Sequence, residues 1–285
     1  MSIGHLAIIG CGDIGTRVGL DLEKQGWRIS AMRRRVEQLP SSFEGFAGDY
    51  TRVTDLLPLV AQRPTHLLFT PLPMGRDAAG YELGFMGGVS AMIEAGLADE
   101  VPFGVMVSST RVYAESAGGW VDEASPLTTE DAAAQAIIRA ENRWREALAH
   151  KTVARASGLY GELPGVLLSR VASGLASQDS DRISNRIHRD DVAAALVFLL
   201  RDSFCESLPA TLLLSDSTPT PIGEVEAWLA QQLGVSLAYS NTATAAFRGN
   251  RRCNNQLLKD LGFNLRYPSY REGYAAMLSQ RSPRE

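Results

Sequence analysis

Short apolar runs of strand length alternate with longer segments of helical spacing in the first quarter of the chain. A short, wholly apolar run suits a strand that is buried on both faces, because such a strand has no polar side to alternate with. The alternation predicts βαβ units and therefore a parallel sheet with helices packed on it. The expected elements of this stretch are His5 to Ile9, Ile14 to Lys24, Trp27 to Met32, Thr51 to Ala61 and His66 to Phe69.

The same pattern continues into the middle of the chain. Further strands are expected at Val101 to Val107, Thr152 to Ala156 and Thr211 to Leu214. Asp131 to His150 is predicted to be one helix, because it is rich in Ala, Glu and Arg and contains no Pro. The expected fold class is therefore α/β, with a doubly wound parallel sheet.

Beyond Tyr160 the pattern becomes less regular. Gly161 to Gly165 marks a turn, and Ser173 to Ser184 has the composition of a polar connection. We place the start of a smaller C-terminal lobe at this point. Helices are expected again at Ile222 to Leu233 and in a segment that ends near Leu261.

Charge and composition narrow the function classes. With 28 Lys and Arg against 32 Asp and Glu, the net charge of -4 gives no long-range attraction to nucleic acid or to an anionic membrane. The longest apolar run, Val192 to Leu200, falls short of the ~20 residues that cross a bilayer. Scattered Cys11, Cys205 and Cys253 predict neither disulfides nor a metal site, and no signal peptide is recognised. We expect a cytoplasmic protein with a small-molecule substrate and no metal.

A glycine-rich turn follows the first expected strand and opens the first expected helix. In that context Gly10 permits the tight turn, Gly12 lets a diphosphate approach the backbone, and Gly15 lets the helix pack on the strand. Asp13 and Ile14 complete the turn at the helix N-terminus, which adds amide donors and a partial positive charge. The turn predicts a Rossmann-type domain that binds NAD(P).

The end of the second expected strand separates NADP from NAD. In an NAD site an acidic residue there binds the ribose hydroxyls, but this strand ends in Arg33, followed by Arg34. Guanidinium groups grip phosphate oxygens, so both arginines favour NADP, with NAD as the alternative. A solvated surface patch is the competing interpretation. Asp49, after the third strand, is expected either to contact the adenine amino group or to cap its own loop.

Three further segments, together with the glycine turn, resemble a known family. They are Ser108 to Tyr113, Arg155 to Gly161 and Ile187 to Ala193. The chain resembles the extended short-chain dehydrogenase/reductases, and more closely the atypical bacterial members named NAD-dependent epimerase/dehydratases or nucleoside-diphosphate-sugar epimerases. The resemblance runs over nearly the whole length, to Arg251 to Asn255 and Tyr267 to Gly273.

The resemblance implies an NAD(P)-binding oxidoreductase or epimerase that acts on a small polar substrate such as a nucleotide sugar. With the boundary placed above, residues 1–160 and 186–216 form the expected NAD(P)-binding domain, and residues 161–185 and 217–285 form the smaller substrate-binding lobe. The family often pairs its subunits through the long helix that here includes Ala133, so a homodimer is expected.

The family's catalytic residues are only partly present. Matching its Val–Tyr pair places the substrate-orienting hydroxyl on Ser109, with Thr110 as a second choice. The alternative is that these hydroxyls satisfy backbone groups at the strand end. The family's acid/base Tyr, and the Lys that lowers the tyrosine pKa from ~10, fall on Ala133 and Ile137. Neither of these side chains can move a proton.

A proton donor would have to come from elsewhere in the chain. The candidates are Tyr113, beside Ser109, and His188, because an imidazole has an ordinary pKa that suits proton transfer near neutrality. Each has a structural alternative, a single satisfied hydrogen bond at a strand end. Asp191 is expected to cap the helix of Val192. The missing pair also leaves a second function class open, a non-catalytic NADP(H) sensor or interaction protein.

Overall fold

The computed structural model describes residues 3–201, 208–239 and 249–280, so Cys205 lies outside the described residues. The chain divides into two compact units. The first comprises Met1–Val112, Leu127–Arg155 and Val192–Leu212, and the second comprises Tyr113–Pro126, Ala156–Asp191 and Leu213–Glu285. Among the described residues, no helix is both long and apolar enough to pass through a bilayer. The division into a cofactor domain and a substrate lobe stays a prediction about function.

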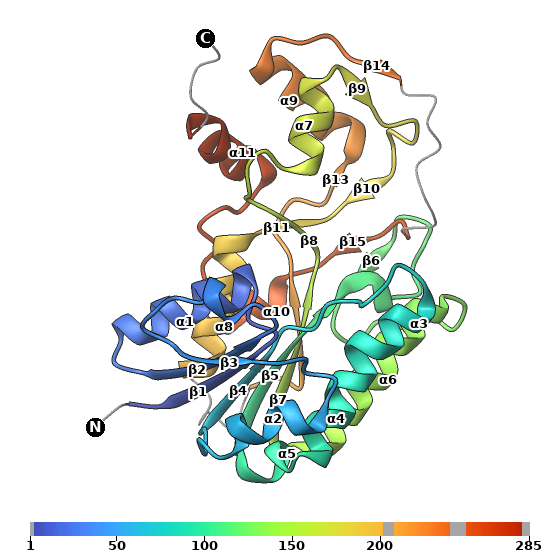
Figure 1. Ribbon diagram of the computed structural model, residues 1–285. Helices are drawn as coiled ribbons and strands as arrows, with labels where there is room; N and C mark the ends of the chain where they lie inside the picture. The colour runs from blue at the N-terminus through green and yellow to red at the C-terminus, as the bar shows by residue number, and fades with distance from the viewer. Residues whose placement is uncertain (1–2, 202–207, 240–248, 281–285) are drawn as a thin grey trace. The chain divides into compact units, whose positions relative to one another are not determined.

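A seven-stranded sheet organises the first unit (Figure 1). The strand order is β12-β7-β5-β4-β1-β2-β3, and the ladders that join β3, β2, β1, β4 and β5 are parallel. The order reverses between β1 and β4, the switch point beyond which α/β proteins bind ligands. The bounds are β1 His5–Ile9, β2 Arg28–Arg33, β3 Glu44–Ala47, β4 His66–Phe69, β5 Phe103–Ser109, β7 His150–Ala156 and β12 Thr211–Leu214.

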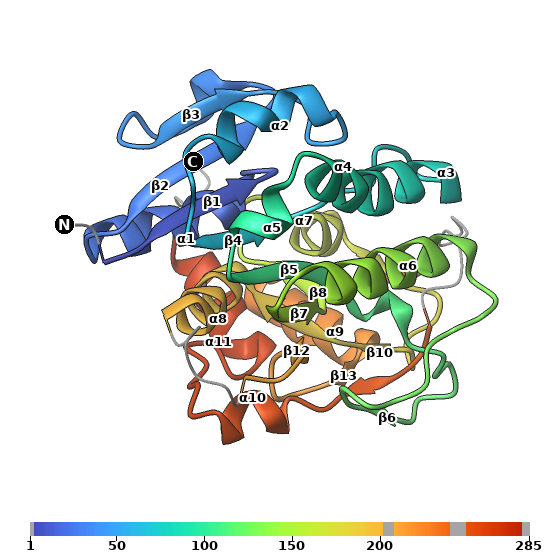
Figure 2. The same ribbon diagram turned by 90° about the horizontal axis from the view of Figure 1, so that it is seen from below.

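Helices cover both faces of this sheet (Figures 1 and 2). Helices α1 and α8 lie on one face, and α2, α4 and α6 lie on the other. The bounds are α1 Asp13–Lys24, α2 Val53–Val60, α3 Ala78–Tyr81, α4 Gly88–Glu94, α5 Leu97–Glu100, α6 Ala132–Ala147 and α8 Arg189–Arg201, with the π-helix η2 Glu82–Gly87 and the 3-10 turns η1 Val36–Gln38 and η3 Thr110–Val112. The doubly wound α/β fold that the sequence predicts is confirmed.

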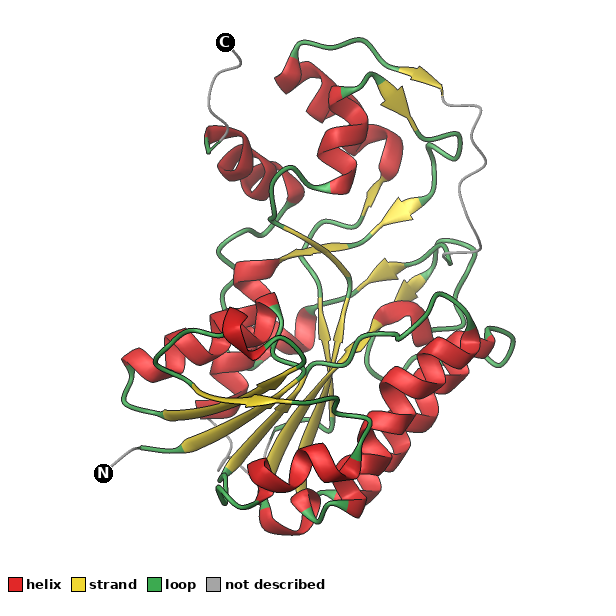
Figure 3. Ribbon diagram, in the orientation of Figure 1, coloured by secondary structure: helices red, strands yellow, loops and turns green. Residues whose placement is uncertain are grey.

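The second unit is built from helices and short strand pairs (Figure 3). Helices α7, α9 and α11 share a core with Tyr160, in which Val171, Leu229 and Tyr270 are fully buried. The bounds are β6 Trp120–Val121, β8 Gly158–Tyr160, α7 Val166–Ala172, β9 Leu175–Ala176, β10 Ile183–Ser184, β11 Arg186–His188, β13 Thr220–Pro221, α9 Ile222–Leu233, β14 Ala238–Tyr239, β15 Arg252–Cys253, α10 Gln256–Asp260 and α11 Tyr270–Ser279.

Two expected boundaries differ from the structure. The helix predicted to reach His150 ends at Ala147, and His150 already begins β7. The polar connection expected at Ser173 to Ser184 contains β9 and β10, which are two-residue strands. A strand of two residues is too short to leave a periodic apolar pattern in the sequence.

The prediction that Asp191 caps a helix is wrong. Helix α8 begins at Arg189, so Asp191 lies inside its first turn. Its carboxylate instead accepts hydrogen bonds from the backbone N–H groups of Arg266 at 2.7 Å and Tyr267 at 3.0 Å. Asp191 therefore binds the backbone of a segment that is distant in sequence. No local sequence pattern predicts this contact.

Candidate functional site

The glycine turn after β1 is bonded to the end of the neighbouring strand β4. Gly10 has a φ of +76°, and a Cβ added to it would lie 2.8 Å from the carbonyl oxygen of Thr70, so only glycine fits. Thr70 Oγ1 donates to the Gly10 carbonyl at 2.8 Å. Tyr50, after β3, bonds through its hydroxyl to both the N–H and the carbonyl of Leu72 in the loop after β4. The carboxyl ends of three strands are thus joined around the turn.

Gly12 and Gly15 have different surroundings. A Cβ on Gly15 would lie 2.8 Å from Cγ2 of Ile8, so this glycine allows α1 to pack on β1. A Cβ on Gly12 would meet nothing nearer than the Gly10 carbonyl oxygen at 3.8 Å, and its φ of -92° does not require glycine. No side chain caps α1 there. Helix N-terminal amides beside open space form the kind of site that binds a diphosphate.

The other residues of the turn differ in exposure. Asp13 is exposed and accepts a hydrogen bond from Arg17 Nε at 3.0 Å, and Ile14 is partly exposed. Cys11 is fully buried, and its N–H donates to the Met32 carbonyl of β2 at 2.9 Å. Burial raises the pKa of the Cys11 thiol to about 11, so it is not a nucleophile near neutral pH.

Arg33 and Arg34 lie at the same edge of the sheet as the glycine turn. Met32 pairs with Ile9 in the β1–β2 ladder, so Arg33 is level with the start of the turn. Its guanidinium donates from Nη2 to Gln38 Oε1 at 2.6 Å, which orients it, and Arg34 is exposed. The structure brings both arginines to the end of β2, and their contact with a phosphate stays a prediction.

Asp49 has the contacts of a loop-capping residue. Its Oδ1 accepts from the N–H of Thr51 at 3.0 Å and from Thr51 Oγ1 at 2.8 Å. Its own N–H donates to Asp55 Oδ2 at 2.9 Å. These bonds correspond to one of the two roles that the sequence left open, and contact with an adenine stays a prediction.

Ser109, at the carboxyl end of β5, belongs to a bonded group in the first unit. Its Oγ accepts from the N–H of Arg111 at 3.2 Å. The Arg111 guanidinium donates to the Asp131 carboxylate from Nε at 2.6 Å and from Nη2 at 3.0 Å, and it donates from Nη1 to the hydroxyl of Tyr81 at 3.1 Å. Asp131 also caps α6 by accepting from the N–H groups of Ala133 and Ala134.

The charges in this group reinforce each other. The hydrogen bond to Asp131 raises the pKa of Arg111 above its ordinary value. Burial alone would raise the pKa of Asp131, but the bonds from Arg111 and from the Ala134 N–H lower it. Both side chains are therefore ionised near neutral pH. No sequence pattern predicts a role for Tyr81 or Asp131. Arg111, two residues after Ser109, is the one local feature that could have pointed to this group.

Ala133 and Ile137 are the residues that the family resemblance aligns with its acid/base pair, an alignment that stays a prediction. They are 6% and 0% exposed, and both belong to the buried side of α6. On the same helix, Glu141 is fully buried and accepts from Ser108 Oγ at 2.6 Å and from Arg155 Nη2 at 2.6 Å. Helix α6 thus anchors the end of β5 but presents no titratable group at those two positions.

Tyr113 and His188 both belong to the second unit. Tyr113 is 1% exposed. The His188 ring is 5% exposed, with its centroid 5.1 Å from that of Tyr160 and 4.1 Å from that of Tyr267. Its Nδ1 accepts from the N–H of Asp190 at 3.2 Å. The bond to Nδ1 suits the structural alternative for His188. The role of either residue as a proton donor stays a prediction.

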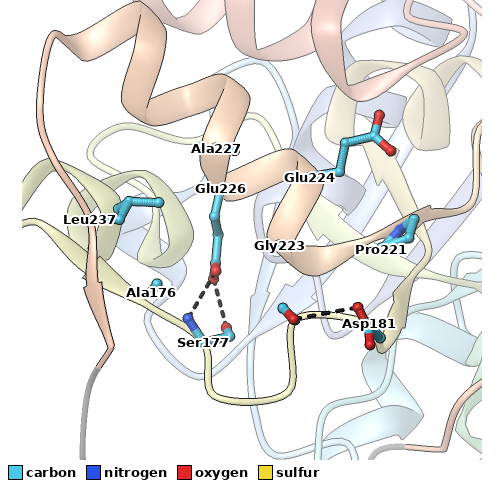
Figure 4. Close-up of a pocket in the computed structure, with 10 residues that line it drawn as sticks. Ala176, Ser177, Asp181, Pro221, Gly223, Glu224, Glu226, Ala227 and Leu237 are labelled. Atoms are coloured by element: carbon cyan, nitrogen blue, oxygen red, sulfur yellow. Dashed lines mark hydrogen bonds between the residues drawn. The ribbon is translucent and has the colours of Figure 1, made fainter.

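The second unit also contains a pocket of about 410 Å³ beside α9 (Figure 4). Glu226 points to Ser177, accepts from its N–H at 2.9 Å and its Oγ at 2.6 Å, and is also bound by Arg170. Asp181 and Glu224 add further carboxylates to the lining. No residue that the sequence predicts for the cofactor or the chemistry lines this pocket.

Comparison with known proteins bears on the family resemblance. No protein-family model matches the chain. The Escherichia coli K12 protein YeeZ is 26% identical over 204 residues, which cover 69% of this chain and 73% of YeeZ. A solved structure from Methylobacillus flagellatus carries the name of a proposed NAD-dependent epimerase/dehydratase. It is 28% identical to this chain with a TM-score of 0.80, and the alignment covers 98% of each chain.

The UDP-glucose 4-epimerase of Thermus thermophilus, solved in complex with NAD, is 17% identical with a TM-score of 0.76. The alignment covers 94% of this chain and 96% of the epimerase. The resemblance to the atypical extended short-chain dehydrogenase/reductases is therefore confirmed, and the chain has their fold over nearly its whole length.

Proposed function

We propose that the chain binds a nicotinamide dinucleotide at the turn from Gly10 to Gly15. The observation that carries the proposal is Gly12, which neither packing nor backbone conformation requires. A glycine that faces open space before the uncapped N-terminus of α1 suits a diphosphate held by backbone amides. The neighbouring residues fit the same group, because Gly10 and Gly15 satisfy the turn and the packing that the nucleotide-binding motif needs.

The cofactor proposed is NADP(H), with NAD(H) as the alternative. Arg33 ends β2 and Arg34 follows it, next to the glycine turn, where a phosphate on the adenosine ribose would require cations. Gln38 holds the Arg33 guanidinium from one side. Asp49 would contact the adenine from the end of β3.

The activity proposed is that of an epimerase or oxidoreductase acting on a small polar substrate of the nucleotide-sugar class. When bound, the nicotinamide would supply hydride chemistry, and the protein would supply orientation and proton transfer. Ser109 would hold the substrate oxygen at the carboxyl end of β5. The second unit would provide the substrate-binding lobe, and the protein would act as a homodimer.

Nucleotide binding and turnover by the purified full-length protein test this proposal. Calorimetric titration is expected to show binding of NADPH in preference to NADH. A panel of nucleotide sugars with NADP⁺ is then expected to reveal turnover that Ser109→Ala reduces. Failure to bind either nucleotide would end the proposal.

A second function is favoured by one specific observation. Ala133 and Ile137, which the resemblance aligns with the family's acid/base pair, are apolar and buried. This suits a protein that binds NADP(H) as a sensor without catalysis. Steady turnover that disappears in Ser109→Ala would exclude this alternative. Tight nucleotide binding without turnover of any substrate in the panel would favour it.

A further inference from the structure

Tyr81 and Arg111 form a pair that the sequence does not predict. Nη1 of Arg111 donates to the Tyr81 hydroxyl at 3.1 Å, and the guanidinium carbon lies 4.9 Å from the tyrosine ring centroid. Tyr81 is partly exposed. A fixed cation beside a phenol stabilises the negative charge that develops when the phenol gives up its proton.

The backbone around Tyr81 is held against the loop that follows β4. A Cβ on Gly80 would lie 2.3 Å from Cα of Gly75, and one on Gly84 would lie 2.1 Å from the carbonyl oxygen of Leu72. The Met74 N–H also donates to the Gly80 carbonyl at 2.9 Å. Contact this close fixes the helix that carries Tyr81 to the carboxyl end of β4.

Arg111 is fixed from the other side. It follows β5, the neighbour of β4 in the sheet, and its N–H binds Ser109 Oγ. Its guanidinium is held by two bonds to Asp131, the residue that caps α6 two positions before Ala133. Tyr81 therefore lies in one bonded group with the substrate-orienting serine and with the helix turn that lacks the family's tyrosine.

The helix changes form directly after Tyr81. Residues Glu82–Gly87 form a π-helix between α3 and α4. π-Helical turns of this kind occur often at functional sites. This one begins directly after the residue that contacts Arg111.

We propose that Tyr81, held by Arg111, is the catalytic proton donor that stands in for the absent tyrosine and lysine; this rests on the proposed function. The step is a proton transfer alone. The phenolic O–H bond of Tyr81 breaks, an O–H bond forms on a substrate oxygen that carries developing negative charge, and that charge moves to the phenolate. Arg111 stabilises the phenolate, which regains a proton from water.

The first test needs no substrate. In protein with isotope-labelled tyrosine, the NMR signal of the ring carbon that bears the hydroxyl of Tyr81 is assigned by its loss in Tyr81→Phe. We expect saturating NADPH to move this signal, and Arg111→Met to move it in the free protein. Arg139→Met is the matched control, because Arg139 also binds a carboxylate, that of Glu82 at 2.5 Å. It should leave the Tyr81 signal in place.

The outcomes separate this inference from the proposed function. Calorimetry on the same sample shows whether NADPH binds. No binding overturns the proposed function and the inference with it, whereas binding that leaves the Tyr81 signal unmoved overturns the inference alone.

The second test uses the nucleotide-sugar panel. Tyr81→Phe is expected to lower kcat about 100-fold or more while leaving KM and NADPH affinity nearly unchanged, the usual contribution of a general acid. Arg111→Lys, which keeps the cation, should retain more kcat than Arg111→Met. Full activity in Tyr81→Phe, with the loss found in Tyr113→Phe or His188→Gln instead, would assign the donor elsewhere. Nucleotide binding without turnover of any panel member would favour the sensor alternative and overturn the inference.

Discussion

Thr70 donates a hydrogen bond of 2.8 Å from Oγ1 to the carbonyl oxygen of Gly10. The Thr70 N–H also donates to the carbonyl oxygen of Ile9 at 3.0 Å. The last residues of β1 are thereby fixed by the residue after β4, at the point where the strand order reverses. The shape of the proposed diphosphate site thus depends on a side chain from a different strand.

Replacing Thr70 by valine tests this dependence. Thr70→Val removes the donor to Gly10 but keeps the shape, so we expect unfolding free energy to fall by about 1 kcal/mol and NADPH affinity to fall about fivefold. Thr65→Val is the matched control. Thr65 precedes β4 at the opposite end of that strand, and its Oγ1 bonds to the backbone N–H and carbonyl of His5 at the start of β1. It should lose similar stability without losing affinity. Equal affinity losses in both variants would show a general effect on the fold.

Arg33 and Arg34, at the end of β2, should set the cofactor preference. We expect Arg33→Ala and Arg34→Ala each to weaken NADPH binding about tenfold or more and NADH binding by less than about twofold, because only NADPH carries the additional phosphate. Arg35→Ala is the control on the same segment. Titration calorimetry of the unmodified protein and the three variants with both nucleotides gives the affinities needed. A parallel loss for NADH and NADPH would contradict a role in phosphate recognition.

The buried carboxylate of Glu141 should matter strongly for stability. Arg155 is 3% exposed and binds this carboxylate, so Glu141→Ala removes the buried anion that Arg155 contacts. We expect the unfolding free energy to fall by about 3–5 kcal/mol, as when one partner of a buried ion pair is removed. Denaturant unfolding measures the loss. The double variant Glu141→Leu with Arg155→Met should recover part of it, and no recovery would contradict the pairing.

Stability should depend on pH through Asp216. Burial raises the pKa of Asp216 from 3.8 to about 7, with Arg186 opposing the shift. Because the folded state then binds more protons than the unfolded state between about pH 4 and about pH 7, stability falls as the pH rises through that range, by at most about 1.4 kcal/mol per pH unit.

Asp216→Asn should remove this dependence, because the amide does not ionise and its oxygen can still accept from the Thr218 N–H. Thermal melts of both proteins across this range measure the effect. The variant is expected to be the more stable of the two above pH 7. Parallel curves for the two proteins would mean that Asp216 remains ionised throughout.

Local features of the site could be predicted from sequence, and distant ones could not. The glycine turn is recognisable from sequence because its three glycines lie within six consecutive residues after an apolar strand. The contact of Arg111 with Tyr81 joins residues 30 positions apart, and its partner Asp131 is a further 20 positions along. No periodic pattern connects such residues, so only the folded sheet brings them together. Asp191 failed as a predicted cap for the same reason, since its partners lie 75 and 76 positions away.

The affinity of Gly12 variants for NADPH tests the central claim most directly. Gly12→Val fills the space before α1, so we expect affinity to fall tenfold or more, a loss of at least about 1.4 kcal/mol. The melting temperature should stay unchanged, because the nearest heavy atom to the new Cβ beyond the two chain neighbours is the Gly10 carbonyl oxygen at 3.8 Å. Gly87→Ala, on the helix after β4, should keep both properties. Undiminished NADPH binding by Gly12→Val would contradict a nucleotide site at this turn.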